Sequence, residues 1–137
     1  MKYIIFFLFG LLITSCEPGY RVYIYNKSPS NVYLKIKPSI ESRYSDLSTY
    51  RDSILKHKVS EIDGFSTYRI KPNDRFLIMG AIGGPSVKYL PFDWIELISA
   101  KDTIILDSKE KIFKELVRAK NAKRKGKGGD YYIEIIK

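Results

Sequence analysis

A single histidine limits the catalytic chemistry that this chain could perform. A Ser-His-Asp or Cys-His arrangement would have to use His57, because the 137 residues contain no other histidine. His57 stands between Lys56 and Lys58 in a stretch without a clear hydrophobic period, and neighbouring cations disfavour a charged imidazole. We therefore interpret His57 as a solvated surface residue. We predict no catalytic residues and expect that the protein is not an enzyme.

The spacing of the acidic residues indicates neither a general acid–base pair nor a metal site. Asp93 and Glu96 lie three apart on a predicted strand, so their side chains point to opposite faces. Glu61 and Asp63 share a face but stand beside Gly64, as turn residues do. The carboxylates also lack the alternating spacing of a calcium loop. We expect neither a metal nor a cofactor.

The only cysteine follows an apolar leader, and its position predicts lipid attachment. The leader has a positive start and an apolar run at residues 4–13, and it ends in Ile13-Thr14-Ser15-Cys16. These four residues resemble the lipobox of bacterial lipoproteins, in which an aliphatic residue, a small or β-branched residue and a small residue precede an obligatory Cys. The resemblance implies export, cleavage before Cys16, and attachment of diacylglyceryl and palmitate-type acyl chains to that residue.

Two other interpretations of the leader are open. A retained transmembrane helix needs about 20 apolar residues, and this run breaks at Thr14. A plain secretory signal cut after Ser15 would leave an exported free thiol without an internal partner. The lipoprotein interpretation gives a signal peptide at residues 1–15, a lipidated Cys and short tether at 16–20, and a single β-rich domain at 21–137. It places the domain on the cell membrane or outer membrane, facing the periplasm or the cell surface.

The formal charge of +9 predicts contact with anions. Nucleic acid is not the expected partner, because an exported domain meets lipid headgroups and acidic glycans instead. The densest cations, Lys123, Arg124, Lys125 and Lys127, precede the last predicted strand in a glycine-rich segment. A solvated connecting loop would have the same composition. On a tether that reaches only about 14 Å, these cations could also touch an anionic membrane or glycan surface.

An aromatic and basic strand face is a further candidate site. Tyr23, Tyr25 and Tyr33 alternate with apolar residues on two predicted strands, and Arg21 and Lys35 share their face. Aromatic rings flanked by cations can bind sugars, peptides or anions. Tyr is also a favoured strand residue whose ring covers a sheet without any binding role.

Alternation of apolar and polar residues predicts that most of the domain is strand. We expect three hairpins, formed by residues 21–25 with 32–37, 66–71 with 75–80, and 93–99 with 103–106. A short strand at 59–62 and a last strand at 131–136 complete the set.

One amphipathic helix is predicted before the last strand. Asp107 and Glu110 have the spacing of a capping box. An apolar stripe that should pack on a sheet follows: Ile112, Phe113, Leu116 and Val117. The predicted fold is therefore mainly β, an antiparallel β-sandwich or open barrel of seven or eight short strands with one amphipathic helix before the last strand.

The pattern of the strands carries a second resemblance. Residues 22–26, 92–97 and 102–106 are similar to strands of small lipoproteins common in the Bacteroidota, and no catalytic residues come with that likeness. We expect a membrane-anchored envelope lipoprotein that acts as a non-catalytic binding or accessory module for a protein partner or glycan, in an oligomeric state left open. The alternatives are a small envelope hydrolase, in which His57 would meet two acids in a cleft, and an inhibitor or immunity-type lipoprotein, which would show a protruding loop.

Overall fold

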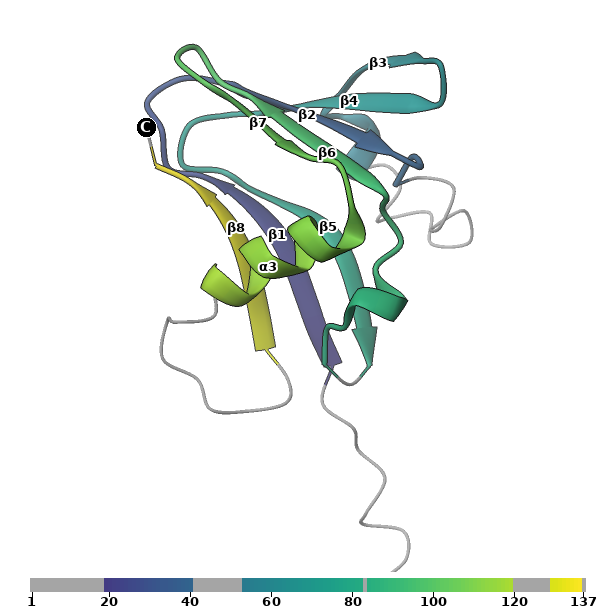
Figure 1. Ribbon diagram of the computed structural model, residues 1–137. Coiled ribbons are helices and arrows are strands. Elements are labelled where there is room, and N and C mark those ends of the chain that lie inside the picture. Colours follow the sequence, from purple (N-terminus) through teal and green to yellow (C-terminus); the bar gives the residue numbers. More distant parts are fainter. Residues whose placement is uncertain (1–18, 41–52, 83, 120–128, 137) are drawn as a thin grey trace, which may run out of the picture.

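The computed structural model describes residues 19–40, 53–82, 84–119 and 129–136. Within these ranges the protein is mainly β, with eight strands in two sheets and the helix α3 before the last strand (Figure 1). The elements are β1 (Gly19–Asn26), β2 (Val32–Lys37), β3 (Lys58–Ile62), β4 (Phe65–Ile70), β5 (Arg75–Ile82), the 3-10 turn η2 (Val87–Tyr89), β6 (Trp94–Ile98), β7 (Thr103–Leu106), α3 (Lys109–Ala119) and β8 (Gly129–Ile135). The predicted fold class is confirmed.

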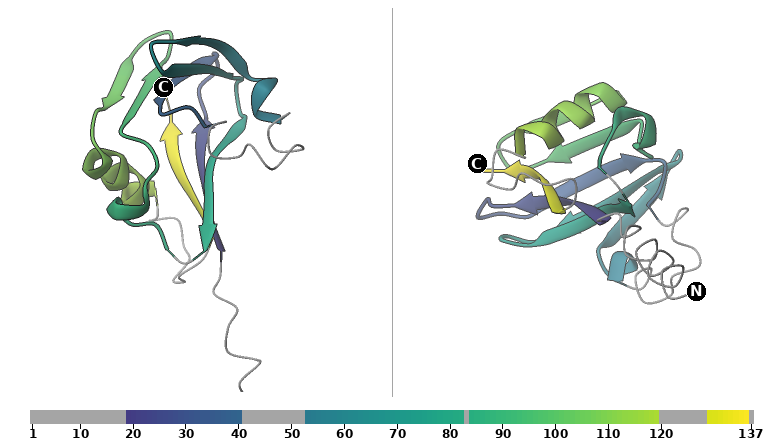
Figure 2. Two further views of the ribbon diagram at one scale, coloured as in Figure 1. Left: turned by 90° about the vertical axis from the view of Figure 1, so that its right-hand side faces the viewer. Right: turned by 90° about the horizontal axis from the view of Figure 1, so that it is seen from below.

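The strands form a small sheet in the order β5-β1-β8 and a large sheet in the order β3-β4-β2-β6-β7. All pairings are antiparallel except that of the first strand with the last, because β1 and β8 run parallel. Side chains from both sheets and from α3 meet in one core, in which Ile24, Leu34 and Ile112 are fully buried. The helix packs on the same side of the small sheet as the large sheet does (Figure 2).

Two of the three predicted hairpins are wrong. The strands themselves form at the expected places, but β1 and β2 belong to different sheets, and so do β4 and β5. The β6–β7 hairpin is confirmed, and β3 pairs with β4. Alternation shows which side chains face the core, but it is the same whether the next strand turns back in its own sheet or crosses to the other one.

Asn26 ties together two of the connections that cross between the sheets. Its side chain is fully buried, and its Nδ2 donates hydrogen bonds to the carbonyl oxygens of Ser30 at 2.8 Å, Ile70 at 3.1 Å and Lys71 at 3.1 Å. Its Oδ1 accepts from the backbone N–H of Ser28 at 3.0 Å and from the Ser28 hydroxyl at 2.6 Å. The β1–β2 and β4–β5 connections are therefore held side by side at one corner.

The helix starts one residue later than the predicted capping box implies. Ser108 is the cap, because its Oγ accepts a hydrogen bond from the Lys111 N–H at 3.3 Å. Asp107 instead pairs with Lys111 Nζ at 2.7 Å, and this hydrogen bond holds the pKa of Asp107 below its ordinary value. The predicted apolar stripe does face the core at Ile112 and Leu116. Among the described residues, no helix has the length and apolar character needed to cross a membrane.

Candidate functional site

The outer face of the small sheet gathers aromatic and charged side chains from all three of its strands. β1 alternates, so Val22 and Ile24 enter the core while the residues between them face outward. We call this surface the tyrosine face, and its members are Arg21, Tyr23, Tyr25, Lys27, Arg75, Asp130, Tyr132 and Glu134.

Three tyrosine rings and one guanidinium form the centre of the tyrosine face. Tyr23 stacks on Tyr132 with ring centroids 5.6 Å apart and planes at 20°, and the Tyr25 ring lies 6.1 Å from that of Tyr132. Arg75 Cζ is 5.0 Å from the Tyr25 centroid and 5.4 Å from the Tyr132 centroid. Both distances are within the range of about 6 Å in which a cation is attracted to an aromatic ring face. Arg75 therefore packs against two aromatic rings at once.

Ion pairs enclose this centre on both sides. Arg21 Nε meets Asp130 Oδ1 at 3.0 Å, and Lys27 Nζ meets Glu134 Oε1 at 2.8 Å. Among the residues that the structure describes, Arg75 has no carboxylate partner. Three cations therefore face two carboxylates, which leaves the tyrosine face with one excess positive charge.

Tyr132 has a raised pKa on the tyrosine face. Removal from water is the main cause that raises its pKa above the ordinary value, and the nearby Asp130 carboxylate adds to this while Arg75 opposes it. The phenol therefore stays protonated at neutral pH. It accepts a hydrogen bond from Arg75 Nη1 at 3.4 Å and donates one to Asp130 Oδ2 at 3.4 Å.

The structure brings together only part of the aromatic face that was predicted from the sequence. Arg21, Tyr23 and Tyr25 lie on the tyrosine face as expected, but Tyr33 and Lys35 lie on β2, in the large sheet. There Lys35 pairs with Glu96 at 3.5 Å. The prediction of one shared surface was wrong because it assumed that β1 and β2 form a hairpin.

Sequence reasoning missed the partners that complete the tyrosine face. Arg75 lies opposite Tyr25 on β5, and Tyr132 lies opposite Tyr23 on β8. The alternation of Asp130, Tyr132 and Glu134 with apolar residues was visible in the sequence and does indicate an outward face. The parallel pairing of β8 with β1 was not visible, so nothing in the sequence joined the two sets.

Two other predicted sites lie outside the described residues. These are the lipidation site Cys16 and the basic segment Lys123, Arg124, Lys125 and Lys127. Lipid attachment and contact with an anionic surface remain predictions for them.

His57 is less exposed than the sequence indicated. Its Nδ1 lies 3.1 Å from the carbonyl oxygen of Arg69, which can only accept, so Nδ1 carries the proton. The ring packs on Phe76 with centroids 5.3 Å apart. The main-chain oxygen of His57 also accepts from the Arg69 N–H at 2.7 Å, next to the β3–β4 pair. The interpretation as a solvated residue is therefore corrected, because His57 is half-buried and has structural contacts.

These contacts predict a measurable stability effect. His57→Ala removes one hydrogen bond and one aromatic contact, and it should lower the free energy of unfolding by about 1–2 kcal/mol. Urea unfolding of the domain from residue 17 onward measures this change. Lys56→Ala, at the exposed neighbouring residue, is the control and should change stability by less than about 0.5 kcal/mol. Equal stability of the two variants would contradict the structural role of His57.

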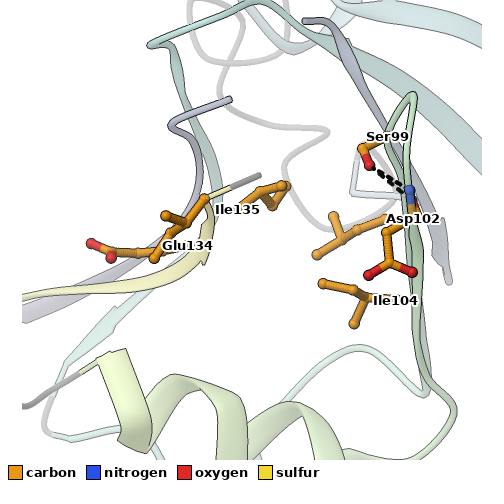
Figure 3. A pocket seen from close by; sticks show the side chains of 7 residues that line it. Ser99, Asp102, Ile104, Glu134 and Ile135 are labelled. Carbon is orange, nitrogen blue, oxygen red and sulfur yellow. Dashed lines mark hydrogen bonds between the residues drawn. The ribbon is translucent and has the colours of Figure 1, made fainter. Parts of the chain in front are cut away.

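A small pocket opens between the β6–β7 hairpin and the end of β8 (Figure 3). Its volume is about 190 Å³, and it is lined by Leu97, Ser99, Asp102, Ile104, Glu134, Ile135 and Ile136. Ser99 Oγ accepts from the Asp102 N–H at 3.0 Å, so this hydroxyl serves the hairpin turn. The lining is mostly apolar and suits an aliphatic group. Within the described ranges, no three His, Cys, Asp or Glu side chains are grouped so that they could hold a metal ion.

The tyrosine face can recognise a ligand through phenol hydroxyls, ring edges and guanidinium N–H groups. Its ring faces are covered by neighbouring rings and by cations. Its ion pairs are already formed without a ligand. No protein-family model, curated protein or solved structure was found to match this chain.

Proposed function

We propose that this protein is a lipid-anchored cell-envelope protein that binds a partner, without catalysis, through the tyrosine face. The anchor is supported by the lipobox resemblance at Ile13-Thr14-Ser15-Cys16. The observation that carries the binding role is the packing of Arg75 against Tyr25 and Tyr132. An arginine held between two rings on an outer sheet face has the composition of a protein-binding hot spot.

A protein partner fits this surface better than a glycan. Sugars stack on open aromatic ring faces, but Tyr23 and Tyr132 cover each other here. Lys27 Nζ lies 5.2 Å from the Tyr25 centroid and covers that ring as well. What remains accessible is rigid, rich in Tyr and Arg, and carries one excess positive charge, which suits an acidic protein surface.

A site-specific photo-crosslinking experiment tests the binding role. A photoreactive phenylalanine derivative replaces Tyr132 in the full-length protein, in intact cells. A matched protein carries it at Tyr33, which is 38% exposed on the large sheet. We expect one discrete crosslinked protein from position 132 and none from position 33. Equal crosslinking from both positions, or none from either, would contradict a binding role for the tyrosine face.

Arg75→Ala should then weaken the captured complex. Loss of a hot-spot arginine costs about 2 kcal/mol or more, which corresponds to a dissociation constant roughly 30-fold higher. Titration of the purified partner measures it. Arg69→Ala, on an exposed arginine of the large sheet, is the matched control and should leave the affinity unchanged. A glycan ligand would instead show saturable binding of envelope polysaccharide with the same dependence on Arg75.

The β3–β4 hairpin supports the inhibitor-type alternative as a second candidate. Val59 and Ile62 on β3 are 56% and 67% exposed, and the turn that follows is fixed by Asp63 and Gly64, with φ of 53° and 76°. A rigid hairpin with exposed aliphatic side chains can enter a partner's cleft. Placing the same photoreactive group at position 62 distinguishes the two, since an inhibitor would crosslink there and not at position 132.

A further inference from the structure

Three strand ends meet at the end of the domain where the described chain begins. β1 starts at Gly19, which pairs with Ile82 at the end of β5, and the next residue, Tyr20, pairs with Gly129 at the start of β8. The 3-10 turn η2 is the short green helical turn at the lower right of Figure 1, toward the same end. We call this end the base.

The base carries apolar and aromatic side chains that the fold does not bury. Ile82 is 74% exposed and Tyr89, in η2, is 62% exposed. Lys88, also exposed, places its Nζ 5.7 Å from the Tyr89 ring centroid. The core is closed without these three side chains, so their exposure needs another explanation.

We propose that the base docks on the surface of the lipid bilayer, with Ile82 and Tyr89 in the interfacial layer and Lys88 beside lipid phosphates. This inference rests on the proposed lipid anchor. Cys16 stands three residues before Gly19, a stretch that reaches only about 10 Å. An anchored domain therefore has its base against the membrane. Tyr is favoured where a bilayer meets water, and Lys extends its amine to the headgroups.

Other exposed aliphatic residues lie away from the tether and serve as internal controls. Ile62, 67% exposed, belongs to β3 in the large sheet, which lies at the far end of the domain from the base in Figure 1. Similar side-chain size and exposure at Ile62 and Ile82 make the two positions comparable. Only Ile82 should contact lipid.

The test measures membrane contact at these two positions in the full-length, lipidated protein. Acylation consumes the Cys16 thiol, so Ile82→Cys or Ile62→Cys supplies the only free thiol for a fluorophore that reports polarity. Each labelled protein is reconstituted into phosphatidylcholine vesicles with and without phosphatidylglycerol. We expect a blue-shifted emission from position 82 and several-fold stronger quenching by nitroxide-labelled lipid than from position 62. Lys88→Gln should reduce the difference between the two vesicle compositions.

The possible outcomes separate the docking of the base from the anchor itself. Co-flotation with vesicles and labelled fatty acid in the protein report the anchor. If the protein floats but position 82 is as exposed to water as position 62, docking of the base is wrong and the anchor stands. Equal lipid quenching at both positions also overturns a specific contact of the base. Protein that carries no lipid and does not float would overturn the anchor. Circular dichroism establishes that both labelled variants are folded.

Discussion

Asn26→Leu should lower the free energy of unfolding by about 3–5 kcal/mol, the largest stability effect that we expect from a single polar substitution in this protein. Leu has the same branched arrangement of side-chain heavy atoms as Asn, but it is bulkier and has no hydrogen-bonding atoms. Three carbonyl oxygens would lose their common donor, and the Ser28 N–H would lose its acceptor. The Ser28 hydroxyl would lose its bond to Asn26 and keep only the one to the Ser30 carbonyl oxygen at 3.0 Å. Each buried polar group left without a partner costs about 1–3 kcal/mol.

This decrease would be a large part of the free energy of unfolding of a typical domain, which is roughly 5–15 kcal/mol. Urea unfolding followed by the fluorescence of the single tryptophan, Trp94, measures it. Asn26→Asp is a second variant. It keeps the shape, but it aims a carboxylate oxygen at three carbonyl oxygens and should also be strongly destabilising. Asn31→Ala, at an exposed position of the same connection, is the control and should change stability by less than about 0.5 kcal/mol. A stable Asn26→Leu protein would show that the corner does not depend on this side chain.

Cys16→Ser should abolish incorporation of labelled fatty acid and leave an unprocessed precursor that retains residues 1–15. Cys16 is the only cysteine, so no other thiol can accept the diacylglyceryl group that the lipobox resemblance implies. One acyl chain holds a protein to a membrane only marginally, but each buried methylene adds about 0.8 kcal/mol, and several chains make release negligible. The substitution should therefore remove the whole lipid contribution to anchoring.

Metabolic labelling with radioactive palmitate, together with the size of the protein on a denaturing gel, gives the result. Ser15→Ala keeps a small residue before the cysteine and should be labelled and processed normally. Labelling of the Cys16→Ser protein at the normal level would refute lipid attachment at this residue, and with it the short tether on which docking of the base depends.

The fold could be predicted at the level of elements but not of their pairing. Val22, Ile24 and Leu34 had to face a core because each alternates with polar neighbours, and all three are buried. Whether the chain between two strands turns back or crosses to another sheet depends on contacts made there. At the β1–β2 connection those contacts come from Asn26 to Ile70 and Lys71, which are distant in the sequence. A local pattern does not contain them.

The candidate site was half predictable for the same reason. Arg21, Tyr23 and Tyr25 stand on one strand, so alternation alone groups them on one face. Arg75 and Tyr132 join them through strand pairs that link residues 50 to 109 positions apart, such as Tyr25 with Arg75 and Tyr23 with Tyr132. Tyr33 was placed with them by proximity in the sequence, which the crossing between sheets overrides.

The pairing of the last strand with the first has a consequence for how the chain reaches its folded state. β1 can complete its second ladder only after β8 has been synthesised, because Tyr20 pairs with Gly129 and Asn26 with Ile135. Contacts of such long sequence separation form slowly. A nascent chain that still lacks β8 therefore has an open edge on its central small-sheet strand and an unfinished core. For the export that we propose, this order would keep the chain unfolded during passage through a translocation channel and let it fold on the other side.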